Sequence, residues 1–243
     1  MRVLIVSDVH SNIVALETVL AVAGSYDQVW NLGDTIGYGP RPNECVEALR
    51  HSTVLIAGNH DLASLGKVNL ADFNPDARTA NIWNGEQLNA ENRTLLESLP
   101  PRQDVDSRFL AVHASPREPV WEYLLTLDQA RDNFALFTTQ VCLIGHSHVP
   151  LIFRKSADGR HEGPFLPDAG ETLELRDGVR YFVNPGSVGQ PRNQDPRAAY
   201  AILDTDAGTI EFQRIEYDIA QTQRQMQAAN LPSALIRRLE YGM

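Results

Sequence analysis

Residues 2–10 read Arg2-Val3-Leu4-Ile5-Val6-Ser7-Asp8-Val9-His10, a short apolar run that ends in an acid and a histidine. The β-branched apolar residues 2–6 predict a buried strand, and apolar residues recur at helical spacing from Ile13 to Leu20. Residues 28–32 and 54–57 predict two more buried strands, with a helix over 42–49 between them that opens on a proline. Strands and helices therefore alternate, which predicts a largely parallel sheet covered by helices.

The second part of the chain has a different pattern. Residues 62–99 have a mostly helical composition, which Pro100-Pro101 ends. Short strands are then predicted over 109–112, 141–144, 151–153, 173–175, 179–183, 199–203 and 210–215. The turns Asp158-Gly159, Asp177-Gly178 and Ala207-Gly208 predict hairpins. Residues 218–241 return to helix, broken at Pro232. Because no repeat or linker interrupts the chain, we expect a single domain over residues 1–243, with two facing sheets and outer helices.

The charge balance restricts the partners of the protein. The 243 residues include 43% hydrophobic and 21% charged residues, which is typical of a globular chain. Lys and Arg number 21 against 31 Asp and Glu, so the formal net charge is −10. An acidic surface repels phosphate backbones, so a long nucleic acid is disfavoured as a partner.

The cysteines and the N-terminus bear on the compartment. Cys45 and Cys142 form no CxxC pair, which favours a reducing environment and two buried, small apolar side chains. The first apolar run is too short for a secretory signal or a membrane span. We therefore expect a cytoplasmic protein without membrane contact.

Polar residues gather directly after the predicted strands. The clusters are Asp8-Val9-His10, Gly33-Asp34, Gly58-Asn59-His60-Asp61, His113 and Gly145-His146-Ser147-His148. Five of the seven histidines lie in them, whereas His51 and His161 lie outside and are predicted to be surface residues. Strand ends in open α/β sheets meet at one edge, so the clusters should converge. The glycines are expected to let the backbone turn sharply, so that each following side chain points into the site.

The residue types in these clusters favour metal binding. Aspartate and neutral imidazole are good ligands for Mn, Fe, Zn, Co or Ni. The absence of a nearby thiolate argues against a structural zinc cage. Dinucleotide-binding, P-loop and nucleophile-elbow motifs fail on spacing.

In this order, from Asp8 to His148, the clusters resemble the calcineurin-like metallophosphoesterases. Gly37-Tyr38-Gly39-Pro40 and Asn184-Pro185-Gly186-Ser187 resemble the small bacterial and archaeal branch of that family. The resemblance implies an α/β fold, a four-layer αββα sandwich of two mixed β-sheets flanked by helices. It also implies a metal-dependent hydrolase of phosphoric esters.

The resemblance further implies a site with two divalent transition-metal ions, Mn²⁺ ahead of Fe, Zn, Ni or Co. One ion is held by Asp8, His10, Asp34 and His148, and the other by Asp34, Asn59, His113 and His146. In this family such a pair clamps the phosphate and shares a hydroxide that attacks it. His60 then protonates the leaving oxygen or holds the phosphate, and Asp61 either orients its ring or caps the helix that follows.

The second block departs from the family pattern. The family often continues it to Asp-Arg, whereas Gly37-Tyr38 follows here. The missing phosphate contact then falls to Arg117 or Arg192. Asn12 either caps the first helix or touches substrate, and Trp121 and Tyr123 either border the pocket or belong to the core.

The expected substrate is a small phosphodiester or phosphomonoester such as a nucleotide, with the diester favoured. A nuclease with the same dinuclear site is one alternative, which a basic groove beside the metals would support. A non-catalytic metal-binding scaffold of the same fold is another, against which the full ligand set and His60 argue. A structural metalloprotein is a third and predicts bound metal without turnover.

Overall fold

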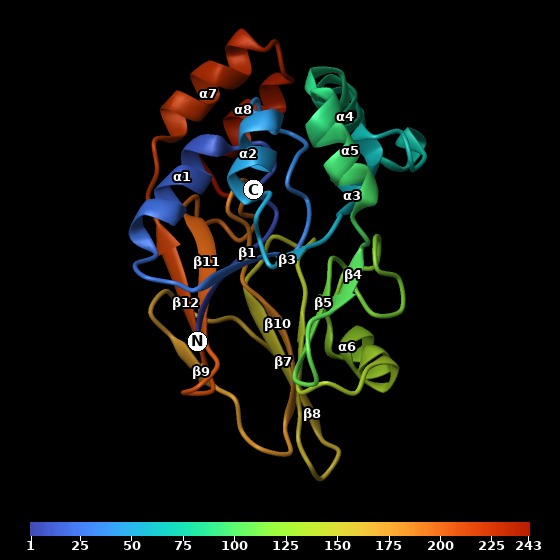
Figure 1. Cartoon of the computed structure of the whole chain (residues 1–243), viewed down its shortest axis with the longest axis vertical. Helices are drawn as coiled ribbons and strands as arrows, with labels where there is room; N and C mark the ends of the chain where they lie inside the picture. Colours follow the sequence, from blue (N-terminus) through green and yellow to red (C-terminus); the bar gives the residue numbers. More distant parts are fainter.

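The computed structural model describes residues 1–243 and contains two six-stranded β-sheets with helices outside them (Figure 1). The first sheet has the order β3-β2-β1-β11-β12-β9 and the second β4-β5-β6-β10-β7-β8. The strands of the first sheet are β1 (Arg2–Val6), β2 (Gln28–Asn31), β3 (Val54–Leu55), β9 (Thr172–Glu174), β11 (Ala198–Asp204) and β12 (Thr209–Ile215). Those of the second are β4 (Arg102–Asp104), β5 (Phe109–Val112), β6 (Val141–Leu143), β7 (Leu151–Lys155), β8 (His161–Phe165) and β10 (Arg180–Asn184).

Both sheets mix parallel and antiparallel pairs. In the first sheet, β1 pairs in parallel with β2, with Val3 opposite Gln28, and antiparallel with β11. In the second, β6 lies between β5 and β10 and is parallel to both. The sequence-based prediction of two mixed sheets in an α/β sandwich is confirmed.

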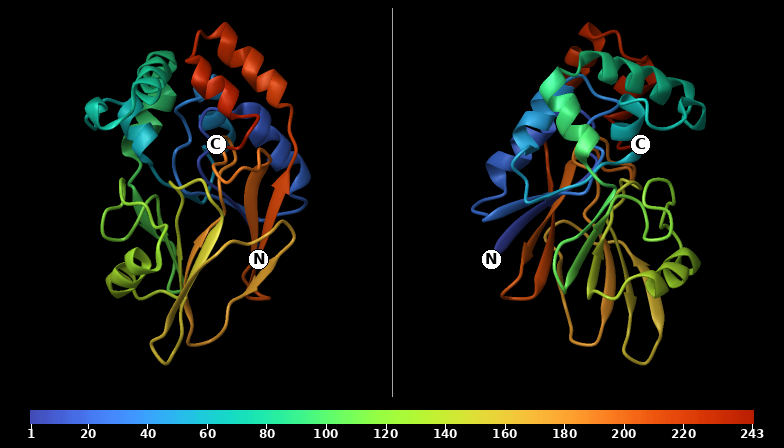
Figure 2. Two further views of the ribbon diagram at one scale, coloured as in Figure 1. Left: turned by 180° about the vertical axis from the view of Figure 1, so that it is seen from behind. Right: turned by 45° about the vertical axis from the view of Figure 1, so that its right-hand side comes forward.

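The helices are α1 (Ile13–Val22), α2 (Pro42–Leu49), α3 (Asn59–Ser64), α4 (Pro75–Gln87), α5 (Ala90–Ser98), α6 (Leu127–Asn133), α7 (Ile219–Ala228) and α8 (Ser233–Arg238). One core of buried side chains, among them Ile5 and Val183, lies between the two sheets. A second core joins α1 and α2 to the outer face of the first sheet, and a third joins α6 to the outer face of the second (Figure 2). Four layers result. No helix is long and apolar enough to cross a bilayer.

A fourth cluster joins helices from distant parts of the chain. Ala77 of α4, Met226 of α7 and Leu235 of α8 pack together with Tyr38 and Phe73. In Figure 1 these helices stand together at one end of the molecule, beyond the strands. The C-terminal helices therefore help to enclose the loops that follow β1, β2 and β3.

The structure corrects one predicted hairpin. The turn at Ala207-Gly208 joins two predicted, antiparallel strands, as expected. Asp158-Gly159 also forms a hairpin, but with β8, a strand that was not predicted. Asp177-Gly178 instead joins β9 to β10, which belong to different sheets, so it is a crossover between the layers. A local turn signal defines where the chain reverses but not which sheet the next strand enters.

Three elements were not predicted. Helix α6 is short and begins with a capping box between Thr126 and Gln129. Strand β4 lies at the edge of the second sheet. Strand β8, at the other edge, contains Gly163-Pro164, which reads as a strand breaker in sequence but is tolerated at a sheet edge. Both cysteines are buried, as predicted.

Candidate metal centre

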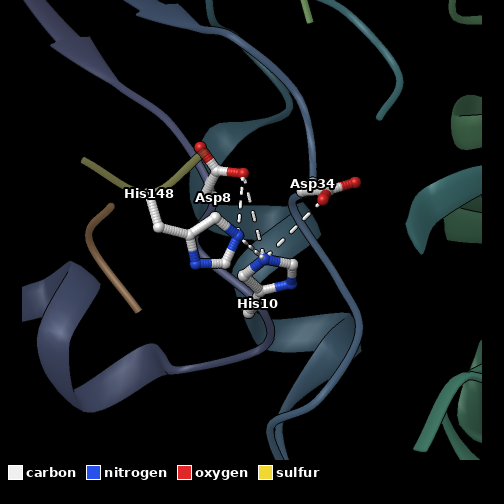
Figure 3. Close-up of side chains that lie close together, drawn as sticks. All are labelled: Asp8, His10, Asp34 and His148. Carbon is white, nitrogen blue, oxygen red and sulfur yellow. Dashed lines mark hydrogen bonds and ion pairs between the residues drawn. The ribbon is translucent and has the colours of Figure 1, made fainter. Parts of the chain in front are cut away.

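The predicted ligands come together where strands of both sheets end. Asp8 follows β1, Asp34 follows β2, Asn59 begins α3, and His113 follows β5. His146 and His148 follow β6, and all seven predicted ligands are buried. Figure 3 shows four of these side chains turned toward one another. The rim predicted from the strand ends therefore exists in three dimensions.

The ligand atoms form two groups that share one carboxylate. The first group is Asp8, His10, Asp34 and His148, and the second is Asp34, His113 and His146. Asp34 Oδ2 lies 3.6 Å from His10 Nε2 and 3.4 Å from His113 Nε2. Asn59 Oδ1 lies 3.2 Å from His113 Nε2, so the predicted amide ligand adjoins the second group. This division is the one that the family resemblance implies.

Backbone carbonyls determine which imidazole nitrogen faces the site. Nδ1 of His10 lies 3.2 Å from Ile36 O, and Nδ1 of His148 lies 2.5 Å from Gln190 O. A carbonyl only accepts hydrogen bonds, so Nδ1 carries the proton and Nε2 of each neutral ring keeps its lone pair. His146 has the opposite arrangement, with Nε2 3.2 Å from Trp121 O, which leaves Nδ1 for the site.

These lone pairs provide a test of whether the residues fit a metal ion. Nε2 of His10 and Nε2 of His148 lie 3.0 Å apart, and neither has a proton to donate to the other. Asp34 Oδ2 is buried and accepts no hydrogen bond. Converging acceptors without a donor are unfavourable unless a cation lies among them. The donor set of nitrogen and oxygen atoms therefore fits divalent transition metals.

Burial and nearby charges shift the pKa values of the ligand side chains in different directions. Burial lowers the pKa of His146 to about 3 and holds that of His10 well below its usual value. Burial likewise raises the pKa of Asp8 to about 7. His113 differs because the Asp34 charge overcomes the effect of burial and raises the His113 pKa to about 9. In turn, His113 keeps the pKa of Asp34 below its usual range despite burial. Without a cation, one charged pair stands among neutral ligands.

The backbone at the ligands is strained. Nine non-glycine residues have positive φ, and five of them are predicted ligands: Asp8, His10, Asp34, His146 and His148, with φ between 50° and 65°. The left-handed region is costly for residues with a Cβ, and such strain clusters at functional sites. The turns that aim these side chains are therefore made by the ligands themselves.

Of the three glycines predicted to allow a sharp backbone turn, Gly58 and Gly145 are instead required for their small size. A Cβ on Gly58 would stand 2.0 Å from Asp34 Oδ1, and one on Gly145 would stand 2.1 Å from Ser7 Oγ and 2.9 Å from Asp8 Oδ2. Neither glycine has positive φ, whereas Gly33 does. The expected sharp turn is thus correct for Gly33, while Gly58 makes room for the Asp34 carboxylate and Gly145 for the Ser7 hydroxyl beside Asp8.

His60 lies beside the ligands, and its ring is held by a residue that the sequence did not reveal. Its backbone N–H donates to Asp34 Oδ1 at 2.8 Å, and its ring Nδ1 lies 2.8 Å from Asn81 Oδ1 of α4. Asp61 does not bond the ring and instead accepts the backbone N–H groups of Ile36 and Gly58. Of the two roles open to Asp61, the structure therefore shows the helix cap, and Asn81 orients the His60 ring. No spacing rule joins residues 60 and 81, so only the folded chain reveals this contact.

A cavity of about 270 Å³ opens beside the ligands. Its wall contains the metal-site residues Asn59 and His146, together with His60. Its other lining residues are Tyr38, Asp72, Phe73, Asn74, Ala77, Trp121, Tyr123, Arg192 and Arg238. Trp121 and Tyr123 therefore border the pocket, which was one of the two roles open to them.

Of the three residues predicted to contact substrate, only one lines the cavity. Arg192 lines the cavity. Arg117 does not, and it pairs with Glu122 and Asp132. Asn12 caps α1, accepting the N–H of Ala15 at 3.2 Å, while its amide donates to Gly189 O at 3.0 Å. Asn12 thus has the capping role.

The two histidines outside the clusters lie away from the site. His51 is exposed, as predicted. His161 is half-buried on β8, with its ring 5.4 Å from that of Phe134, so its prediction as a surface residue is only partly right.

Comparison with known proteins agrees with this geometry. Residues 1–208 match the calcineurin-like phosphoesterase superfamily domain. An uncharacterized protein of Methanocaldococcus jannaschii is 36% identical over 98% of this chain and 97% of its own. The crystal structure of a metallophosphoesterase from Sphaerobacter thermophilus is 49% identical, with a TM-score of 0.91 over 100% of this chain and 99% of its own. A hypothetical protein of Pyrococcus horikoshii shares the fold at 19% identity and a TM-score of 0.78, over 100% and 98% of the two chains.

The chain belongs to the calcineurin-like phosphoesterase superfamily. It is a metal-binding hydrolase that acts on phosphoester bonds.

Proposed function

We propose that this protein hydrolyses a small phosphodiester or phosphomonoester with two divalent metal ions. The observation that carries the proposal is the pair of buried ligand groups that share Asp34 beside a cavity of about 270 Å³. A cavity of this size suits a small phosphate ester, up to the size of a nucleotide. We favour the diester and Mn²⁺, with Fe, Zn, Ni or Co as the other candidates.

Two bound ions would neutralise the phosphate charge and supply a nucleophile at neutral pH. Asp8, His10, Asp34 and His148 would hold one ion, and Asp34, Asn59, His113 and His146 the other. The remaining chemistry falls to Arg192, whose guanidinium lines the cavity and binds phosphate oxygens, and to His60.

His60 provides the proton for the leaving oxygen in this proposal. Asn81 engages Nδ1, so Nε2 is the ring atom left for substrate. Burial lowers the His60 pKa to about 4, which keeps the ring neutral in the free protein. An anionic phosphate in the cavity favours the protonated ring. Proton donation therefore follows substrate binding.

A small substrate fits better than a long nucleic acid. The chain carries a formal charge of −10, and three of its surface arginines, at 41, 50 and 131, pair with carboxylates. A nuclease needs a basic track along which the backbone can lie. We therefore rank a nuclease below an enzyme for nucleotide-sized esters, and a metal-binding scaffold below both.

We also propose that the chain acts as one unit. The fourth hydrophobic cluster joins Met226 and Leu235 near the C-terminus to Tyr38 and Phe73 beside the cavity. Removing the C-terminal helices should therefore open the site. A cytoplasmic location remains a prediction, based on the two free cysteines.

Elemental analysis of the purified protein, combined with assays on a chromogenic phosphodiester and its monoester counterpart, tests the proposal. We expect about two ions per chain, loss of turnover on chelation and recovery with Mn²⁺. The ratio of the two rates decides between diesterase and monoesterase. Metal without turnover on either ester would favour a scaffold or a structural metalloprotein, and no metal would contradict the proposed site.

A further inference from the structure

Helix α8 places a second cation in the wall of the cavity. Leu235, Ile236 and Leu239 of this segment pack in the fourth hydrophobic cluster, next to Tyr38 and Phe73. This packing orients the helix so that Arg238 lines the cavity together with Arg192. The two arginines are 46 positions apart in sequence and meet only in the fold.

Neither arginine has an ion pair with an aspartate or glutamate, although ten other arginines of the chain do. Arg192 donates from Nη2 to Tyr38 Oη and to Gln190 Oε1, both at 3.1 Å, and its Nε is buried without an acceptor. Arg238 donates only from Nε, to an oxygen of Met243. Unused guanidinium donors therefore remain at the cavity.

The two cations are close enough to affect each other. Burial, and then the charge of Arg192, lower the pKa of Arg238. Asp72 is the only carboxylate in the lining, and it is exposed. In an acidic chain, two neighbouring guanidiniums without an aspartate or glutamate partner are costly unless an anion joins them.

Several other residues of the cavity wall are aromatic. The rings of Phe73 and Trp121 lie 5.3 Å apart, and Tyr123 stacks on His146 at 4.1 Å with an interplanar angle of 22°. Tyr38 lies 4.3 Å from the ring of His60. Flat aromatic faces suit the stacking of a planar group such as a nucleobase.

We propose that Arg238, beside Arg192, forms an anion subsite that selects substrates carrying a second phosphate besides the hydrolysed one, which Arg192 helps to hold. The substrate class is a nucleotide with two separate phosphate groups, the base resting on the aromatic wall. This inference rests on the proposed phosphoesterase function. Hydrolysis would transfer the OH of water to the phosphorus, break the ester P–O bond and leave the remaining proton on the leaving oxygen, delivered by His60. The second phosphate is unchanged.

The test compares a nucleoside monophosphate with the bisphosphate of the same nucleoside, using protein loaded with Mn²⁺. Each is assayed both as the free nucleotide and with a chromogenic ester on the phosphate to be hydrolysed, so that monoesterase and diesterase activity are both measured. We expect kcat/KM to be about 10-fold or more higher for the bisphosphate, because one charge-assisted contact has this effect. Arg238→Gln should remove most of that preference and leave the monophosphate rate within about twofold, an estimate that assumes independent contacts. Arg237→Gln is the matched control, since Arg237 is exposed on the same helix.

Binding of the same bisphosphate to the metal-free protein, measured by calorimetry, gives a readout that does not depend on turnover. Arg238→Gln should weaken this binding by about 10-fold, and Arg237→Gln should not. Circular dichroism checks that both variants fold.

Two results would overturn the subsite. One is a wild-type protein without preference for the bisphosphate. The other is an equal loss on both substrates in Arg238→Gln, which would mean that both arginines hold the phosphate that is hydrolysed. If the wild-type protein hydrolyses neither nucleotide nor the chromogenic esters, the proposed function fails. The binding measurement then decides the subsite, and unweakened binding in Arg238→Gln rejects it.

Discussion

Replacing Asp34 by Asn should remove the metal ions and the activity together. Asp34 is the only residue common to both ligand groups. The variant keeps the shape of the side chain and an oxygen that can accept the His60 N–H, which lies 2.8 Å away. It removes the negative charge that faces His10 and His113. A loss of metal would therefore come from the charge and not from a collapsed loop.

The distance between Asp34 and His113 allows the loss of electrostatic energy in Asp34→Asn to be estimated. Its Nε2 lies 3.4 Å from Asp34 Oδ2. A pair of unit charges at that distance interacts by about 5 kcal/mol at an effective dielectric constant of about 20. That energy corresponds to roughly 10³- to 10⁴-fold in a binding constant. A divalent ion held by Asp34 should lose at least this factor in affinity.

Metal content after dialysis and turnover of a chromogenic ester are the two measurements. We expect fewer than one ion per chain in Asp34→Asn and activity reduced by roughly 10²-fold or more. Asp72→Asn is the control for metal content, because Asp72 borders the same cavity but belongs to neither ligand group. Two retained ions with near-normal turnover in Asp34→Asn would refute the shared-ligand arrangement.

Three further predictions concern the groups around the ligands. His60→Ala should retain its metal while turnover falls by roughly 10²-fold. As a control, replacing the exposed His51 by Ala should change neither metal content nor turnover. Loss of metal in His60→Ala would mean that His60 has another role. Asn81→Asp places a carboxylate 2.8 Å from His60 Nδ1, so the His60 pKa should rise above about 4. The pH dependence of the rate should shift toward higher pH with it. An unchanged pH dependence would mean that Asn81 does not influence catalysis through His60. Asp34 raises the His113 pKa to about 9, so metal binding at pH 7 must displace the His113 proton, and metal affinity should increase with pH up to about 9. Calorimetry in buffers of different ionisation enthalpy should detect the released proton. A metal affinity that does not depend on pH would contradict this prediction.

Much of the site could be predicted from the sequence because strand ends are local features. Apolar runs such as 2–6 and 109–112 mark strands, and the polar residue that follows each run must lie where the strands of the sheet end. Asp8, Asp34 and His113 all obey this rule. The division of the ligands into two groups came from the family resemblance, and the distances agree with it.

Some conclusions needed the fold because they depend on contacts between distant segments. Asn81 meets His60 because α4 packs against α3, not because of any spacing in the sequence. Gly58 looked like a turn residue, but the nearby carboxylate of Asp34 explains its small size. Asp177-Gly178 looked like a hairpin because the local signal for chain reversal is the same in a crossover.

The sequence alone therefore determined the class of chemistry, since metal ligands are recognised by type and by position after each strand. Tertiary structure decided what surrounds that chemistry. Arg117 and Arg192 are equally plausible phosphate contacts in sequence, yet one is neutralised by Glu122 and Asp132 while the other faces the cavity. Arg238 had no signal at all, because only the packing of α8 brings it there. Charges act through distance in space, and spatial distance between remote residues is set by the fold.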